Sequence, residues 1–429
     1  MNGLKNGWVW LWGLELHWKV LIGMVAGAFY ALALGDAAMN VAPLGDLFLR
    51  LLKMIIVPLV FFSITTGVIG IGDLRSLGRL GGKTFGYYLL TSLAAILIGL
   101  TLTNAIKPGE GVELGATEAA VFDPAVLRTP TGLGDIVMRM VPTNIVKAMA
   151  EGDVLAVIFF ALLLGGVIAQ SPVRVRDQVA PVFRALFEVM MMMTRLVLVL
   201  LPIGVFGLVA KAVAGSGAGL FTAVGWYVVT IACGLCLHLL VVLPVVLWVF
   251  TRKNPLDHLR AVGAAMLTAF STSSSGATLP VTMERVKHGA GVSNKVTSFV
   301  LPLGATINMD GTALYECAGV LFIAQALGFE LSYLQQLVIV ITAFLASVGA
   351  AAIPSAGLVM IFIVLDAVGL GSHPQVPVIV GTMLAVDRPL DMFRTTVNVT
   401  SDTVGAVVVA SSEGERVLSR SEPSDPDSK

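Results

Sequence analysis

The chain has 429 residues, of which 56% are hydrophobic and 13% are charged. So few charges cannot cover the surface of a water-soluble protein of this length, so the composition indicates a protein in a lipid bilayer, and the long uncharged runs described below indicate an all-α fold. Basic and acidic residues balance at 27 each, which excludes the basic surface that a nucleic-acid-binding protein needs.

The N-terminal part predicts an interfacial segment followed by six spans. Residues 1–18 contain Trp8, Trp10 and Trp12 and no small-residue cleavage pattern, which favours an interfacial lead-in over a removable signal peptide. Long runs with few or no charges then predict spanning helices at Val20–Gly35, Met54–Gly72, Thr84–Ile106, Val154–Val173, Val189–Ala210 and Ala212–Thr251.

The three cysteines do not suggest a metal site. Cys233 and Cys236 match the C-x-x-C spacing, but they lie in an uncharged run without acids or a second pair. This pattern is more typical of helix packing through small residues. We therefore assign no disulfide, no bound transition metal and no organic cofactor.

Two later hydrophobic segments are interrupted in the middle. Residues 258–289 are broken between Ser271 and Pro280, and residues 331–365 are broken between Ser347 and Gly357. Lipid cannot satisfy broken backbone, so each break must be buried in protein or line a cavity. Paired interruptions predict two re-entrant hairpins in an inverted-repeat transporter, and two ordinary proline-kinked helices are the alternative.

Residues 296–324 lie between the two hairpins and carry Asn308, Asp310 and Gly311 near their centre. These residue types favour local unwinding, which turns backbone carbonyls away from helix bonding and toward a cation. Asp310 is therefore a candidate cation ligand.

The last hydrophobic segment, residues 374–410, holds charges that a spanning helix should lack. Its polar residues recur every three or four positions and fall within an arc of about 60° on one helical face. They are Asp387, Asp391, Arg394, Asn398 and Asp402. Such charges cost roughly 10 kcal/mol unless partners, water or ligands compensate. We interpret the stripe as part of a binding site, with an ion-pair ladder such as Asp391 with Arg394 as the alternative.

Together these segments predict eight transmembrane helices and two re-entrant helical hairpins. An even number of crossings puts both termini on one side, and basic residues such as Arg50, Arg75 and Arg252 favour the cytoplasm. The polar tail, residues 411–429, predicts disorder.

The motifs of the second half resemble one family. The run Asn308-Met309-Asp310-Gly311-Thr312, the serine-rich break that ends in Thr278-Leu279-Pro280, and the stripe from Asp391 to Asp402 carry the resemblance. They resemble the dicarboxylate/amino acid:cation symporter family, which includes archaeal aspartate transporters and eukaryotic excitatory amino acid transporters. The resemblance implies a glutamate-transporter-like homotrimer. Residues 19–257 would be mainly the scaffold and trimerisation half, and residues 258–410 the transport half, with which the third and sixth spans would move.

For the substrate, the resemblance implies an acidic amino acid. Arg394, helped by Thr312, would take its side-chain carboxylate, and Asp391 would bind its amino group. Asn398 and the serines of the first hairpin would hold the main-chain carboxylate. The chemistry agrees, because a guanidinium fork matches a carboxylate and an aspartate suits an ammonium. The full implied set is Ser273, Ser274, Ser275, Thr312, Ala356, Gly357, Asp391, Arg394, Thr395 and Asn398.

The resemblance also implies three sites for co-transported Na⁺. The first would use carbonyls of Gly304, Asn308 and Asn398 with the carboxylate of Asp402. The second would use Thr306 and Met309 with carbonyls near Ser347, Val348 and Ala350. The third would use Tyr88, Thr91, Ser92, Asn308 and Asp310. Oxygen ligands with one carboxylate at most in each site suit a monovalent ion better than Ca²⁺.

Two further residues are singled out by comparison with the family pattern. The arginine that members place near the substrate is missing at Ser273 and Met392, and Arg388, on the same helical face as Met392, is the candidate for the compensating charge. Glu316 stands where eukaryotic members have a proton-carrying glutamate, so it is the candidate proton carrier.

The predicted function is secondary active uptake of L-glutamate or L-aspartate across a bacterial inner membrane, by elevator-type alternating access. Na⁺ is the expected coupling ion, and coupling to H⁺ is left open. Alternatives with the same fold are a proton-coupled glutamate/aspartate symporter, a C4-dicarboxylate symporter and a neutral amino acid exchanger. An anion channel is the alternative of another class. An enzyme is not expected, because an intramembrane hydrolase using Ser274 or Ser275 would have no motif-borne histidine.

Overall fold

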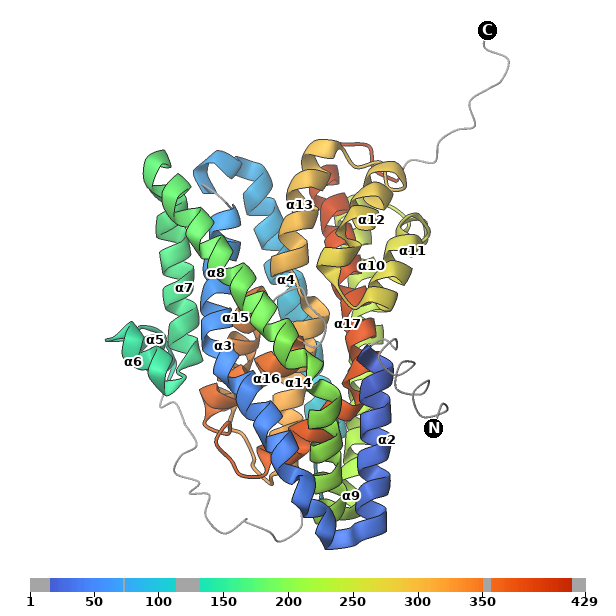
Figure 1. Ribbon diagram of the computed structural model, residues 1–429. Helices are drawn as coiled ribbons and strands as arrows, with labels where there is room; N and C mark the ends of the chain where they lie inside the picture. The colour runs from blue at the N-terminus through green and yellow to red at the C-terminus, as the bar shows by residue number, and fades with distance from the viewer. Residues whose placement is uncertain (1–15, 72–73, 113–131, 350–355, 419–429) are drawn as a thin grey trace, which may run out of the picture.

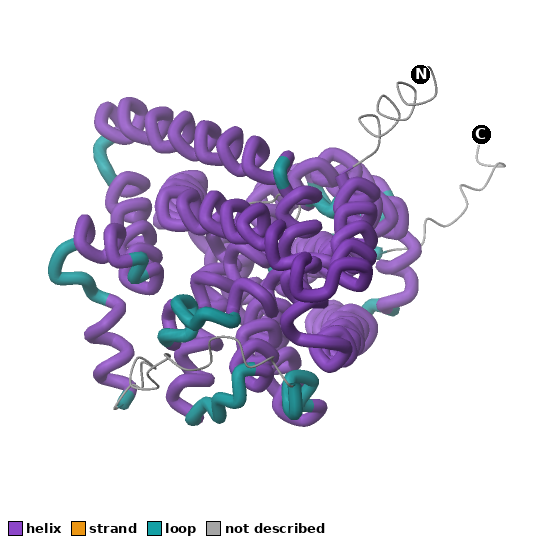
Figure 2. The backbone as a smooth tube through the Cα atoms, turned by 60° about the horizontal axis from the view of Figure 1, so that its bottom comes forward, coloured by secondary structure: helices purple, strands orange, loops and turns teal. Residues whose placement is uncertain are grey.

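The computed structural model describes residues 16–71, 74–112, 132–349 and 356–418, and every regular element in them is helical (Figures 1 and 2). The first group of helices is α2 (Leu16–Leu34), α3 (Ala42–Ile71), α4 (Leu74–Ile106), α5 (Leu133–Met140), α6 (Ile145–Glu151), α7 (Val154–Gln170), α8 (Val173–Val199), α9 (Leu201–Leu237) and α10 (Leu243–Thr251). The second group is α11 (Pro255–Thr272), α12 (Ser275–His288), α13 (Asn294–Ile307), α14 (Asp310–Ala326), α15 (Tyr333–Gly349), α16 (Ala356–Val368) and α17 (Val376–Ser412). A short 3-10 segment, η1 (Gly35–Val41), joins α2 to α3, and a π-helical segment, η4 (His238–Val242), joins α9 to α10.

Close glycine contacts show that the chain reverses between α2 and α3. A Cβ at Gly23 would meet Pro202 of α9, and a Cβ at Gly27 would meet Phe206, so α2 runs parallel to the start of α9. On α3 the order is opposite, because Gly45 lies against Leu208 whereas Phe48 lies against Gly204. These contacts bring helix backbones close together through small residues, as in other membrane helix pairs.

Three stretches of helix are long and apolar enough to cross a membrane, namely Trp18–Gly70, Gly78–Ile106 and Thr222–Thr251. A fourth is added if α8 and residues 201–214 of α9, which are bent by 52°, count as one span. The first stretch has 53 residues, which at 1.5 Å per residue is more than twice the thickness of a hydrocarbon core. Most of the second-half helices fail such a test because they are short, broken or charged.

The bend between α8 and α9 falls inside the predicted span Val189–Ala210. The sequence therefore predicted the helix but not its change of direction. Leu200 separates the two helices, and Pro202 stands near the start of α9, where its missing N–H breaks no helical hydrogen bond.

Two of the three predicted interruptions of the second half lie within the described residues, and both are present there. Helix α11 ends at Ser273, which has a left-handed φ of 50°, and Ser274 caps α12 through a hydrogen bond from the N–H of Ala277. Between α13 and α14, Asn308 and Met309 leave the helical region, as expected for the unwound segment. The break between α15 and α16 includes residues 350–355, which lie outside the described residues.

Helix α17, the last helix of the chain, is packed among the other helices. It packs against α9, α11, α13 and α14, so its polar face is turned into protein (Figure 1). In the described structure, Asp387, Asp391, Arg394, Asn398 and Asp402 are all buried.

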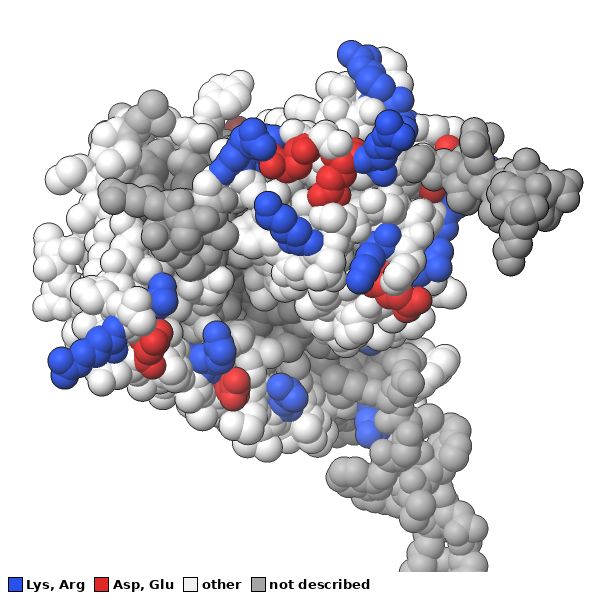
Figure 3. Space-filling model, turned by 90° about the horizontal axis from the view of Figure 1, so that it is seen from above, with Lys and Arg blue, Asp and Glu red and all other residues white. Residues whose placement is uncertain are grey.

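The prediction of disorder from residue 411 is wrong for residues 411–418. Helix α17 continues to Ser412, and the carboxylate of Glu413 accepts hydrogen bonds from Arg79 and Lys83 at the start of α4. These hydrogen bonds lower the pKa of Glu413 to about 2. The following residues pack on the α12–α13 loop, where Val417 is buried. Lys, Arg, Asp and Glu side chains gather on this end of the molecule (Figure 3).

Candidate functional site

Arg394 is the centre of the polar stripe on α17. Its side chain is 1% exposed, and its Nη2 atom lies 3.1 Å from Oδ1 of Asp387 and 2.8 Å from Oδ1 of Asp391. The guanidinium stands 3.7 Å from the centre of the Tyr315 ring on α14. The ion pairs that were weighed as an alternative are therefore present, and they run along one helix.

These ion pairs use only part of the guanidinium. The Nε and Nη1 atoms of Arg394 are buried and have no hydrogen-bond partner in the described structure. The start of α16 lies over Nη1, since a Cβ at Gly357 would come within 2.7 Å of it. The unpartnered Nε and Nη1 atoms leave N–H groups of a buried arginine for a ligand that can accept hydrogen bonds, and a carboxylate suits this role.

Other residues of the implied substrate set meet around Asp391 and Asn398. Arg388 approaches Oδ2 of Asp391 at 3.4 Å, where it can add positive charge. Asn398 accepts from the N–H of Gly311 at 2.8 Å and donates to Thr312 at 3.2 Å, which holds α17 against the start of α14. The hydroxyl of Thr395 donates to the carbonyl of Asp391, so it is turned into its own helix.

The tip of the first hairpin lies beside the same part of α17. Ala265 and Ala269 of α11 form a buried cluster with Val399, the neighbour of Asn398. At the tip, the Oγ of Ser273 is buried without a hydrogen-bond partner, Ser274 caps α12, and Ser275 is buried. The side chain of Ala356 lies outside the described residues, so it cannot be compared with the prediction.

Asp310 is the centre of a second buried polar cluster. Its carboxylate accepts hydrogen bonds from Ser92 at 2.7 Å, from Thr91 at 3.3 Å and from Ser401 at 2.6 Å. Thr91 also lies 3.5 Å from Oδ1 of Asn308. The side chains implied for the third Na⁺ site thus converge from α4 and the unwound segment, and their hard oxygens suit an alkali cation.

The first implied Na⁺ site adjoins this cluster. Asn308 donates to Oδ1 of Asp402 at 2.9 Å. A Cβ at Gly304 would collide with that carboxylate and would come within 2.7 Å of the hydroxyl of Tyr88. Only glycine leaves room here, so the Gly304 backbone, Asp402 and Tyr88 lie close around one point.

The residues implied for the second Na⁺ site are brought together less completely. Thr306 donates to Leu303 and Ser347 donates to Phe344, so both hydroxyls are turned into their own helices. Thr306 and Val348 line one cavity of about 450 Å³ between α13, α15, α3 and α8. Met309 is buried, and Ala350 lies outside the described residues.

Sequence reasoning missed two members of the Asp310 cluster. Ser401 bonds both Asp310 and Asn308, and it stands next to the predicted ligand Asp402. His238 places Nε2 3.0 Å from Oδ2 of Asp310. In the sequence, His238 is a lone histidine in a long apolar run. This pattern could have identified it, because ionisable residues at such depth usually have a function. π-Helical turns such as η4 are likewise frequent at functional sites.

Glu316 lies one turn beyond Thr312 on α14. Its side chain is 0% exposed, and neither carboxylate oxygen has a hydrogen-bond partner among the described residues. A group in this position is stable in apolar surroundings only when a proton or a nearby cation removes its charge.

Comparisons with known proteins agree with this arrangement. A family profile described as the sodium:dicarboxylate symporter family matches residues 16–412. The chain belongs to the sodium:dicarboxylate symporter family. It is 33% identical over 420 residues to the proton/glutamate-aspartate symporter of Escherichia coli, covering 92% of each chain. It is 36% identical over 399 residues to the Bacillus subtilis protein of that name, covering 92% of this chain and 94% of the relative.

The similarity extends to animal members of the family. The chain is 34% identical over 465 residues to excitatory amino acid transporter 3 of Mus musculus, covering 94% of this chain and 87% of the relative. The family and these relatives are transporters, and the matched residues include both polar clusters.

Proposed function

We propose that the protein is a secondary active symporter for L-glutamate and L-aspartate. One observation carries the proposal, the buried Arg394, whose Nε and Nη1 atoms have no hydrogen-bond partner in the described residues and whose Nη1 faces the start of α16. Asp391, one turn away on α17, supplies a partner for the substrate ammonium. The names of the bacterial relatives, which are glutamate-aspartate symporters, support the same substrates.

The coupling of substrate transport to Na⁺ follows from the buried acidic residues. Asp310 and Asp402 lie at 0% and 2% exposure, and a Na⁺ ion at each would offset the cost of holding a charge away from water. Asn398 lies between the substrate residues and the cation residues, so ions and substrate would stabilise each other's binding. The name of the family refers to sodium, whereas the names of the bacterial relatives refer to protons. We therefore propose Na⁺ as the coupling ion and Glu316 as the candidate proton carrier.

The wider mechanism is part of the same proposal. Eight spans and two re-entrant hairpins in inverted repeats would form a homotrimer in the bacterial inner membrane, with both termini cytoplasmic. The packing of α4 against α14 and α17 supports movement of the third span with residues 258–410. Elevator-type movement of that half would carry the site across the bilayer, with the second hairpin as its gate.

The residues favour this function over its competitors. A C4-dicarboxylate has no ammonium for Asp391, and a neutral amino acid has no side-chain carboxylate for Arg394. A hydrolase is disfavoured, because Ser274 is used as a helix cap and the buried His258, at the other end of α11, bonds Thr403. An anion channel would conduct without fixed coupling to Na⁺.

Uptake into proteoliposomes tests the proposal. With an inward Na⁺ gradient, we expect saturable uptake of radiolabelled aspartate that excess glutamate inhibits and excess succinate or alanine does not. Imposed Na⁺ and pH gradients, applied separately, identify the coupling ion. Saturable succinate uptake without aspartate uptake would contradict the proposed substrate, and anion flux that needs no gradient coupling would favour the channel.

A further inference from the structure

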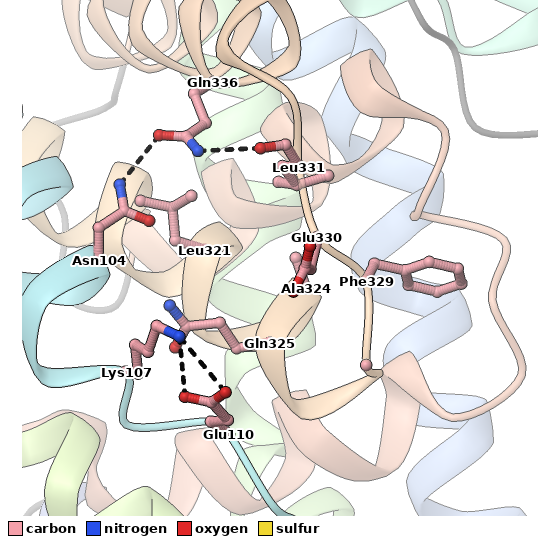
Figure 4. Close-up of a pocket in the computed structure, with 11 residues that line it drawn as sticks. Asn104, Lys107, Glu110, Leu321, Ala324, Gln325, Phe329, Glu330, Leu331 and Gln336 are labelled. Carbon is pink, nitrogen blue, oxygen red and sulfur yellow. Dashed lines mark hydrogen bonds and ion pairs between the residues drawn. The ribbon is translucent and has the colours of Figure 1, made fainter.

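A cavity of about 330 Å³ lies at the opposite end of α14 from Asp310, where α4 and α14 end and α15 begins (Figure 4). Its floor is formed by Leu321 and Ala324, both buried. Its walls carry three amide side chains, Asn104, Gln325 and Gln336, and three charged ones, Lys107, Glu110 and Glu330. The exposed charged residues indicate that the cavity faces water and not hydrocarbon.

Each of the three amide side chains of the cavity has one N–H group in use. Asn104 donates to Oε1 of Gln336 at 2.9 Å, and Gln336 donates to the carbonyl of Leu331 at 3.0 Å. Gln325 donates to the carbonyl of Thr103 at 3.1 Å, outside the cavity lining. Figure 4 shows the ammonium of Lys107 directed at both oxygens of Glu110, the nearer at 3.1 Å.

The lining of the cavity is negative overall. The Oδ1 atom of Asn104 and the carboxylate of Glu330 receive no hydrogen bond or ion pair from the described residues. Lys107 balances one of the two glutamates, so the lining carries one net negative charge. The C-terminal ends of α4 and α14 add the negative end of the helix dipole.

An anion is the less suitable occupant. The one helix N-terminus at the cavity, that of α15, is already capped, because Ser332 accepts from the N–H of Gln335 and the Gln335 side chain accepts from the N–H of Ser332. Two N–H groups of this turn are therefore already used, and a helix N-terminus is the usual anion site.

We propose that this cavity is a binding site for a primary amine cation with a short apolar tail. The ammonium would donate to Glu330 and to Oδ1 of Asn104, and the tail would cover Leu321 and Ala324. A single positive charge matches the net charge of the lining. Bound there, the amine would bridge α4 and the loop between α14 and α15, beside the existing hydrogen bond from Asn104 to Gln336.

Isothermal titration with 2-phenylethylamine tests the site, using the full chain in nanodiscs of phosphatidylcholine and phosphatidylglycerol, which carry no primary amine. We expect one saturable site that does not bind 2-phenylethanol, the neutral analogue of the same shape. Saturating Na⁺ and aspartate should leave the affinity unchanged, because the cavity is separate from the Arg394 site. Absence of amine binding, equal binding of the alcohol, or competition by aspartate would each overturn the proposal.

Two variants and a control locate the amine. Glu330→Gln keeps the side-chain shape and removes its charge, so affinity should fall roughly fivefold, as for an exposed charge pair. Asn104→Asp places a carboxylate where the amide oxygen lies, so affinity should rise. Glu151→Gln, at an exposed glutamate on α6, should change nothing. Unchanged affinity in Glu330→Gln would refute the assignment.

Discussion

The Nε2 atom of His238 lies 3.0 Å from Oδ2 of Asp310, and neither side chain is exposed. An ionised carboxylate can only accept, so with Asp310 in that form the donor of this hydrogen bond is Nε2–H. His238 comes from η4, on the first half of the chain, and Asp310 begins α14. The Asp310 cluster is therefore completed by a residue from outside the segments that carry the family motifs.

His238→Leu should weaken Na⁺ binding about tenfold. The substitution leaves Asp310 without a buried, charge-assisted hydrogen bond, which is worth about 1.5–3 kcal/mol, and the carboxylate loses its fixed orientation. The measurement is the Na⁺ concentration that half-saturates aspartate binding to the purified protein.

Two further variants distinguish a role of His238 in positioning Asp310 from a role in packing alone. His238→Gln retains an N–H donor at similar reach and should restore most of the affinity. His258→Gln changes a buried histidine that bonds Thr403 and should leave the Na⁺ requirement unaltered. Equal Na⁺ affinity in His238→Leu and the native protein would rule out the positioning role.

Arg394→Lys should reduce aspartate affinity by about 10- to 100-fold. Lysine keeps the positive charge that Asp387 and Asp391 need, but it loses the fork that binds a carboxylate through two N–H groups. Calorimetry on the sodium-loaded protein gives the affinity, and thermal unfolding checks that the variant is folded. Arg394→Cys should abolish aspartate binding, and a folded Arg394→Cys variant that binds aspartate normally would remove Arg394 from the site.

Gly304→Ala should impair Na⁺ binding at the first implied site. The new Cβ would collide with the Asp402 carboxylate and approach the Tyr88 hydroxyl, and overpacking of this kind costs about 1–3 kcal/mol. The Na⁺ dependence of aspartate binding should shift to higher concentration. Gly225→Ala on α9 has open space around its Cβ and should be neutral or slightly stabilising. A shift of equal size in both variants would mean that crowding at Asp402 is not the cause.

Glu316→Gln should preserve Na⁺-dependent uptake and flatten its pH dependence. Glutamine occupies the same space without a titratable proton, and both oxygens of Glu316 are buried without a partner in the described residues. Initial uptake rates between about pH 5 and 9 provide the test. If the native protein shows no pH dependence, or if Glu316→Gln retains it, Glu316 is not the proton carrier.

Glu413→Gln should lower the melting temperature at neutral pH, because Gln cannot form ion pairs with Arg79 and Lys83. The pKa of Glu413 is lowered to about 2 in the folded protein, from 4.5. Its contribution is therefore complete above pH 4.5 and is lost as pH falls through 2. The difference in melting temperature between native protein and variant should shrink in that range. A difference that stays constant down to the lowest pH would contradict the ion pairs.

Much of the polar architecture could be predicted from the sequence. Each charge in an apolar helix and each break in a hydrophobic run needs a compensating environment, so Asp310, Arg394 and the interruption at Ser273 were visible as exceptions to a local pattern. The family motifs added roles to these positions. The serine tip, the unwound segment and the buried stripe are all present in the described structure.

The sequence by itself determined that this is a membrane transporter with a buried charged stripe, because the cost of placing charges in apolar surroundings acts on each residue wherever it packs. Only the tertiary structure determined which groups stabilise these buried charges. His238 reaches Asp310 across 72 positions, and Arg79 reaches Glu413 across 334. No local period encodes such contacts, because they depend on how distant helices pack, and the same packing brings Gly357 over Arg394.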